Sequence, residues 1–278
     1  MELPYVKIPN SANISCHVCG RSNSDCFVHP ATPIYPAGVW TPEPTFAKPI
    51  CGSCFRSQAE ETGKRLHEVE PNIPKWVDDQ LERIGMATSE RKADISQVPK
   101  SLLDAVPDVT LKYMLAGVIP KSGVGLAGLA GSGKTSLLAV LVHGLLLQHS
   151  YALAPFQELK GIRQIVWMNW PITCDRWRVN GIDAGIEKEI VKAQRAKLLI
   201  LDDLGRETRR RAASEDAATG HLDAIITERD REQRVTLWST NLTEQELYER
   251  YGTGMIRRLL RKNPIQWLSN SDFHPNAM

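Results

Sequence analysis

The sequence has no long apolar run, no internal repeat and no large excess of charge of either sign. A membrane-spanning helix needs roughly 18 apolar residues without charge. The longest candidate here, residues 137–147, is shorter and contains His143. Residues 1–7 also lack the basic and apolar regions of a secretory signal. We therefore expect a cytoplasmic protein with no membrane partner.

The net charge is only +2, from 34 lysines and arginines against 32 aspartates and glutamates. A chain this close to neutrality has no general affinity for nucleic acid, so any such contact must come from local basic patches. The 278 residues, of which 42% are hydrophobic, have room for one large domain and a small accessory module.

Cysteine is also scarce, and four of the six cysteines form two CxxC pairs near the N-terminus. In a cytoplasmic protein such pairs favour a tetrahedral zinc site over disulfide bonds. We predict a structural Zn²⁺ site, because four thiolates leave no open position for catalysis. The predicted ligands are Cys16, Cys19, Cys51 and Cys54.

Cys26 and His29 leave this ligand set open, because they form a CxxH pair. A compact site that combines them with the first CxxC pair is the alternative, but it would leave the second pair without a role. Residues 55–69 follow the second pair and are rich in helix formers. They predict a trailing helix and a treble-clef-like module.

Residues 128–135 read GLAGSGKT, the GxxxxGK[ST] pattern of a phosphate-binding loop. An apolar run precedes the pattern and a leucine-rich segment follows it, which predicts the required strand, loop and helix. Glycines let backbone N–H groups approach phosphate oxygens, and the helix directs its positive dipole end to the same anion. Lys134 is predicted to contact the β- and γ-phosphates, and Thr135 to bind Mg²⁺. The predicted nucleotide-binding residues are Gly128, Gly131, Ser132, Gly133, Lys134, Thr135, Ser136 and Asp202.

A second motif, residues 197–203, is an apolar strand that ends in two carboxylates. With a phosphate-binding loop upstream, this pattern is typical of a Walker B strand. Asp202 is predicted to hold Mg²⁺ through water, and Asp203 to orient or deprotonate the attacking water. Together the two motifs predict an ATPase, a P-loop nucleoside triphosphate hydrolase.

Two later segments have two interpretations each. Asn241 ends the expected buried strand 235–241. It either senses the γ-phosphate or attacking water, or serves as an N-cap or turn residue before the next helix, and the two roles are compatible. Residues 170–178 interleave tryptophan with arginine, which either stack on single-stranded DNA or pack a helix on the sheet. We favour packing there, and expect Cys174 to be an inert buried thiol.

Two basic segments are also ambiguous. Residues 206–211 contain four arginines, which form a solvated loop or contact a neighbouring subunit or DNA. A helix is expected at 221–231 after them. Residues 257–262 form either a basic surface helix or the source of an arginine that acts in trans on a neighbour's γ-phosphate.

The order of these motifs resembles the AAA+ helicase loaders of the DnaC and DnaI type and the related IstB transposition ATPases. The resemblance lies within residues 98–274 and is carried by LLILDDLG, LWSTNLTEQEL, GTGMIRRLL and LSNSDFH. The Walker motifs alone indicate only a P-loop ATPase. The run from LDDLG through STNL to the arginine–leucine pair is much more specific.

The resemblance implies further roles. Asn241 matches the sensor 1 residue, and Arg258 matches the arginine that acts in trans, with Arg257 as its substitute. A zinc-bearing N-terminal module would engage the replicative helicase, and 170–178 would correspond to an extra helix that lines a DNA channel. Phe273 and His274 stand where the family commonly has an aromatic residue and arginine. The resemblance does not account for the unusually arginine-rich stretch 205–219.

We therefore predict an α/β fold: a P-loop AAA+ core, a parallel sheet flanked by helices, preceded by a four-cysteine zinc module. The predicted domains are 1–69 for this module, 70–97 for a linker with a helix at 76–86, and 98–278 for the ATPase. The predicted catalytic residues are Lys134, Asp202, Asp203, Asn241 and Arg258.

The function implied is an ATP-dependent helicase loader of phage or mobile-element origin. It would bind a replicative hexameric helicase and single-stranded DNA, assemble into a homo-oligomer with ATP, and use ATP, Mg²⁺ and Zn²⁺ as cofactors. One alternative is an IstB-like ATPase that acts with a transposase on duplex DNA. The other is a nucleotide-binding adaptor without significant turnover.

Overall fold

The computed structural model describes residues 70–93, 98–153, 164–180, 184–207 and 214–268, together with five short strands before residue 52. The chain divides into two compact units, Met1–Pro74 with Ser150–Leu159, and Lys75–His149 with Lys160–Met278. The predicted zinc ligands, the trailing helix 55–69, Arg209 to Arg211 and the closing Phe273 and His274 lie outside what the structure describes at the level of side chains.

In the smaller unit, the backbone forms two small antiparallel sheets. One joins β1 (Val6–Lys7), β4 (Cys26–Val28) and β5 (Ile50–Cys51), and the other joins β2 (Ile14–Ser15) and β3 (Ser22–Asn23). The β4–β5 register places Cys26 opposite Cys51. Whether Cys26 joins the predicted metal site therefore stays open.

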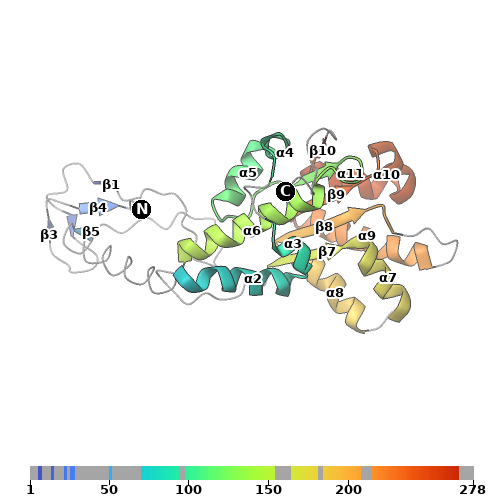
Figure 1. The fold of residues 1–278 in the computed structure, drawn as a ribbon, viewed down its shortest axis with the longest axis horizontal. Helices are drawn as coiled ribbons and strands as arrows, with labels where there is room; N and C mark the ends of the chain where they lie inside the picture. Colours follow the sequence, from blue (N-terminus) through green and yellow to red (C-terminus); the bar gives the residue numbers. More distant parts are fainter. Residues whose placement is uncertain are drawn as a thin grey trace. The chain divides into compact units, whose positions relative to one another are not determined.

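The larger unit contains a five-stranded sheet in the order β10-β6-β9-β8-β7, in which every neighbouring pair is parallel (Figure 1). The strands are β6 (Val124–Ala127), β7 (Ile165–Asn169), β8 (Leu198–Leu204), β9 (Val235–Thr240) and β10 (Ile265–Trp267). The apolar runs of β6, β8 and β9 make these strands buried, as inner strands of a parallel sheet must be. The strand order places β9 between the strands that carry the two Walker motifs.

Five helices pack on one face of this sheet: α7 (Trp170–Asn180), α8 (Ala184–Arg195), α9 (Ser214–Arg231), α10 (Glu244–Tyr251) and α11 (Thr253–Lys262). Their buried residues share a core with Met168, Leu201 and Trp238 of the sheet. The alternating residues Ile165, Ile200 and other strand side chains are buried outside that core, so both faces are covered.

The remaining described helices come before β6 in the sequence, except for the last of them, which directly follows β6. They are α2 (Ile73–Ile84), α3 (Thr88–Arg91), α4 (Lys100–Asp104), α5 (Asp108–Leu115) and α6 (Lys134–Leu153), after a 3-10 turn at Glu70–Asn72. Among the described residues, no helix is long and apolar enough to cross a membrane.

Two predicted boundaries were wrong. The helix expected at 221–231 begins at Ser214, because Gly220 is exposed and is tolerated inside the helix. The helix expected at 76–86 runs from Ile73 to Ile84, and the polar stretch after it contains the short α3.

Candidate functional site

The phosphate-binding loop connects β6 to α6, which begins at Lys134 itself. Gly131 and Gly133 have φ angles of 83° and 81°, a left-handed conformation that favours glycine. The predicted strand, loop and helix are thus present in that order. An α-helix that starts directly at the loop directs its free N–H groups toward the space above the loop, where an anion is favoured.

Lys134 is only 5% exposed, and its ammonium group is held by the loop itself. Nζ donates to the carbonyl oxygens of Gly128 at 2.8 Å and Leu129 at 2.7 Å, and to Ser132 Oγ at 3.1 Å. Burial lowers the pKa of Lys134, while the nearby carboxylates act in the opposite direction. The lysine is therefore a buried cation whose present partners are neutral oxygens.

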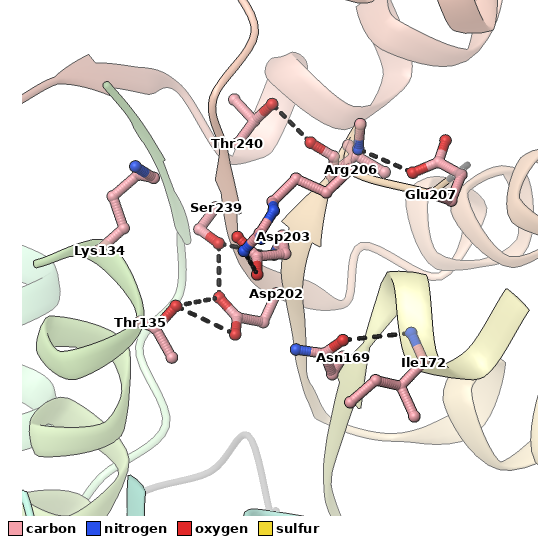
Figure 2. Close-up of polar contacts among 12 residues, drawn as sticks. Lys134, Thr135, Asn169, Ile172, Asp202, Asp203, Arg206, Glu207, Ser239 and Thr240 are labelled. Carbon is pink, nitrogen blue, oxygen red and sulfur yellow. Dashed lines mark hydrogen bonds and ion pairs between the residues drawn. The ribbon is translucent and has the colours of Figure 1, made fainter. Parts of the chain in front are cut away.

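Asp202 is fully buried at the carboxyl end of β8 and lies against the phosphate-binding loop. Thr135 Oγ1 donates to its two carboxylate oxygens at 3.0 and 3.2 Å, and Ser239 Oγ donates to Oδ1 at 2.5 Å (Figure 2). Burial raises the pKa of Asp202, and these hydrogen bonds oppose the rise. A threonine hydroxyl beside a carboxylate is an oxygen donor set that suits Mg²⁺.

Asp203 adopts an unusual backbone conformation, with a φ angle of 60°. Its backbone N–H donates to Ser239 Oγ at 2.8 Å, and its carboxylate accepts from Arg206 Nη1 at 2.8 Å. Positive φ outside glycine is uncommon and tends to occur at functional sites. The Asp203 side chain is also less buried than that of Asp202, at 15% exposed.

The turn after Asp203 is anchored from two directions. Thr240 Oγ1 donates to the carbonyl of Leu204 at 2.7 Å, and the N–H of Gly205 donates to Glu207 at 3.0 Å. Glu207 is in turn held by the last residues of α10. Arg250 Nε donates to its carboxylate at 2.9 Å, and the Tyr251 hydroxyl donates to the same oxygen.

β9 ends at Thr240, so Asn241 lies one residue beyond the strand that it was predicted to end. Its Oδ1 is buried and has no hydrogen-bond partner among the described residues. The interpretation of Asn241 as an N-cap is wrong, because Thr243 is the N-cap of α10 and forms a capping box with Glu246. The alternative of a turn residue stays open, since Asn241 lies between β9 and α10. The sensor role of Asn241 remains a prediction.

The tryptophans of α7 pack inside the protein. Trp170 and Trp177 are 1% and 7% exposed, and their rings meet edge to face at 5.6 Å. Neither ring face is available for base stacking, so packing is the correct interpretation for these two residues. Cys174 between them is buried, and burial raises its pKa to about 12, which makes it the inert thiol that we expected.

The two candidate trans-acting arginines lie on α11. Arg258 Nη1 donates to Asp223 at 2.7 Å and to Thr227 at 3.0 Å, both on α9 of the same chain. Arg257 is exposed. Both arginines therefore stay candidates, because an action in trans involves a second chain.

Sequence reasoning missed three polar groups at this site. Ser239 bridges Asp202 and the N–H of Asp203, and Arg206 pairs with Asp203. Glu90 of α3 lies close enough to both aspartates that their charges contribute to the rise of its pKa, after burial. Ser239 lies in β9 two residues before Asn241, so its position could have been found from the sequence. Nothing in the polar stretch around Glu90 indicated its position.

Within the described residues, no group of three or more histidine, cysteine, aspartate or glutamate side chains is arranged to hold a metal ion. The predicted zinc cysteines fall outside that part of the chain. The residues that fit Mg²⁺ are therefore Thr135 and Asp202, which would share the ion with the phosphates of a nucleotide.

No protein-family model matches the sequence. No curated protein sequence matches it either. Among solved structures, a putative primosome component from Streptococcus pyogenes serotype M3 is 19% identical with a TM-score of 0.50, and the match covers 69% of this chain and 93% of that one.

Two other structures give similar matches. The DnaC helicase loader is 20% identical with a TM-score of 0.47, covering 66% of this chain and 100% of that one. DnaI is 18% identical with a TM-score of 0.49, covering 67% and 93%. At these identities the likeness concerns the fold. The parallel five-stranded sheet flanked by helices is the α/β architecture that we predicted.

Proposed function

We propose that the chain is an ATPase whose nucleotide lies over the loop 128–135. The observation that carries this proposal is the direct contact between Thr135 and Asp202, 67 residues apart in the sequence. Mg²⁺ bound by these two residues would neutralise phosphate charge.

Each residue then has a distinct task. Lys134 exchanges the loop carbonyls for phosphate oxygens, and Asp203 orients the attacking water. Asn241 hydrogen-bonds the γ-phosphate or that water, and Arg258 reaches the nucleotide of a neighbouring subunit. Because the reaction is a phosphoryl transfer to water, positioning and charge neutralisation account for most of the catalysis.

We further propose that this ATPase is a helicase loader. The motif run from LDDLG through STNL to the arginine–leucine pair supports this assignment. The Streptococcus protein of the same fold is described as a primosome component, which agrees with a role in replication. The partners would be a replicative hexameric helicase and single-stranded DNA, in the cytoplasm, with a homo-oligomer forming on ATP.

The proposed division of labour follows the sequence. Residues 1–69 form the zinc module that grips the helicase, 70–97 form a linker, and 98–278 form the ATPase. A module with little apolar sequence needs metal binding to supply its folding energy. Replacing the cysteines of one pair should therefore unfold the module and abolish helicase binding.

The test is size-exclusion chromatography with light scattering on the full chain mixed with its host's replicative helicase, with and without ATP. We expect a complex that is lost when Cys51 and Cys54 are both replaced by alanine. Replacing the buried Cys174 by alanine is the control and should leave the complex intact. A chain that does not bind the helicase but assembles with ATP on duplex DNA would support the IstB-like transposition ATPase instead. A chain that binds ATP without turnover would support the adaptor.

A further inference from the structure

Arg206 is the first arginine of the run behind the Walker B strand, and it lies on the carboxylate of Asp203. Its guanidinium is 2.8 Å from Asp203 Oδ2. The Arg206 side chain is 59% exposed, whereas that of Asp203 is 15% exposed. Figure 2 shows the arginine side chain running back along the turn to reach the aspartate. The residue proposed to orient the attacking water is thus covered by a cation from the same chain.

The backbone that carries Arg206 is fixed. Its own N–H donates to the carbonyl of Asp203 at 3.2 Å, and Gly205 before it is held by Glu207. Glu207 is anchored to Arg250 and Tyr251 of α10. The side chain of Arg206, and not its backbone, is therefore the part that can change its partner.

The charge of Arg206 also acts on the phosphate-binding loop. Its charge lowers the pKa of Lys134, in addition to the larger effect of burial, so the two cations lie near one another. Both cations donate hydrogen bonds to oxygens of the protein: Lys134 to loop carbonyls and Arg206 to the Asp203 carboxylate. A terminal phosphate is a stronger acceptor than a carbonyl, and its geometry matches the fork of a guanidinium.

We propose that Arg206 is a γ-phosphate contact supplied by the same chain as the nucleotide site. It rests on Asp203 in this structure, and moves to the γ-phosphate when ATP binds, which frees the Asp203 carboxylate to orient water. ADP lacks the γ-phosphate, so Arg206 makes the site distinguish ATP from ADP. This inference rests on the proposed nucleotide site over residues 128–135.

The competing explanation is an ordinary surface ion pair, which contributes little to stability. The chain contains a matched example. Arg231 pairs with Glu228 at 2.7 Å with the same three-residue spacing, and its side chain is 69% exposed. It lies at the end of α9. An experiment that treats both arginines alike therefore separates a phosphate contact from a surface pair.

The experiment uses the full chain and competition against a fluorescent ADP, with Mg²⁺ present. The probes are ADP and the non-hydrolysable analogue AMPPNP. For Arg206→Gln we expect AMPPNP to bind about tenfold more weakly, the loss typical of a hydrogen bond to a charged group, and ADP affinity to stay within about twofold. For Arg231→Gln both affinities should stay at the wild-type values.

The unchanged ADP affinity also shows that Arg206→Gln is folded. An equal loss for both nucleotides, no loss for either, or tighter AMPPNP binding would overturn the inference. In those cases the wild-type chain still binds nucleotide, so the proposed nucleotide site stands. A wild-type chain that binds neither probe would overturn both.

Discussion

Asp202 carries a conflict between stability and function at the level of a single side chain. It is fully buried beside Asp203, and burial raises its pKa above the ordinary value. The charged form therefore costs folding free energy. Asn at this position keeps an oxygen that accepts from Thr135 and Ser239 but has no charge to bury.

We predict that Asp202→Asn raises the free energy of unfolding at pH 7 and abolishes ATP hydrolysis. The measurement is urea unfolding without nucleotide, together with an ATPase assay. Because a raised folded-state pKa means that the native state takes up a proton first, the stability advantage should shrink as the pH falls through that pKa. Asp79→Asn on the exposed face of α2 is the control and should change stability by less than about 0.5 kcal/mol. A variant less stable than wild type at pH 7 would contradict the prediction.

At the scale of elements, the turn after β8 is held by a helix far away in the sequence. Glu207 accepts from Arg250 and Tyr251, and these side chains are mostly buried. Burial raises the pKa of the Tyr251 hydroxyl, and the Glu207 carboxylate adds to that rise. The end of α10 therefore fixes the geometry of the turn that carries Asp203 and Arg206.

Tyr251→Phe should lower stability by roughly 1 to 2 kcal/mol, because it removes one donor to a buried carboxylate. It should also slow ATP hydrolysis more than it weakens ADP binding, since the turn loosens while the loop 128–135 is untouched. Chemical denaturation and steady-state kinetics would measure the two effects. Tyr248→Phe is the matched control: this hydroxyl donates to Glu244 within the same helix at an exposed position, so less than about 0.5 kcal/mol is expected. Equal effects from the two substitutions would remove the role assigned to Tyr251.

The strands β8 and β9 and the start of α10 show which features the sequence can predict. Apolar runs that lead to Asp202 and Asn241 identify β8 and β9, because parallel strands are buried along their length. Thr243 followed by Glu246 indicates a helix start, because the pair forms a local capping box. These features depend on neighbours in the sequence.

The features that could not be predicted from the sequence depend on partners that are far away in the sequence. The pairing of Glu207 with Arg250 joins positions 43 residues apart, and no local pattern marks it. The burial of Trp170 and Trp177 depends on α8 and α9, which the alternating tryptophans and arginines of α7 do not indicate. The proximity of Glu90 to the aspartates likewise comes from packing of the segment before the first strand of the large sheet.

At the scale of the whole molecule, α11 packs on the core through its apolar residues and contacts α9 through Arg258. Met255, Ile256 and Leu259 are buried against the core, which fixes the helix. Arg258 then pairs with Asp223 and Thr227 on α9. Two hydrogen bonds from one nitrogen hold the guanidinium in place while its side chain stays 34% exposed. This position suits an arginine that serves a neighbouring subunit once the chain assembles.

Mixing two inactive variants tests this role. Arg258→Ala keeps its own nucleotide site but supplies no arginine, and Lys134→Ala supplies the arginine but has a defective site. Each alone should lose ATP hydrolysis, on the order of 10³-fold for Arg258→Ala. Mixed assemblies should regain activity, with a maximum near equal amounts, because the intact site of one variant then meets the arginine of the other.

Arg257→Ala on the exposed side of the same helix is the matched control, and should hydrolyse ATP alone at close to the wild-type rate. If Arg257→Ala were inactive and complemented Lys134→Ala while Arg258→Ala stayed active, the trans role would pass to Arg257. Two inactive variants that never complement would mean that the arginine acts within its own chain. Recovery of activity requires that two chains share one site, so a positive result would also establish the oligomer as the active form of the ATPase.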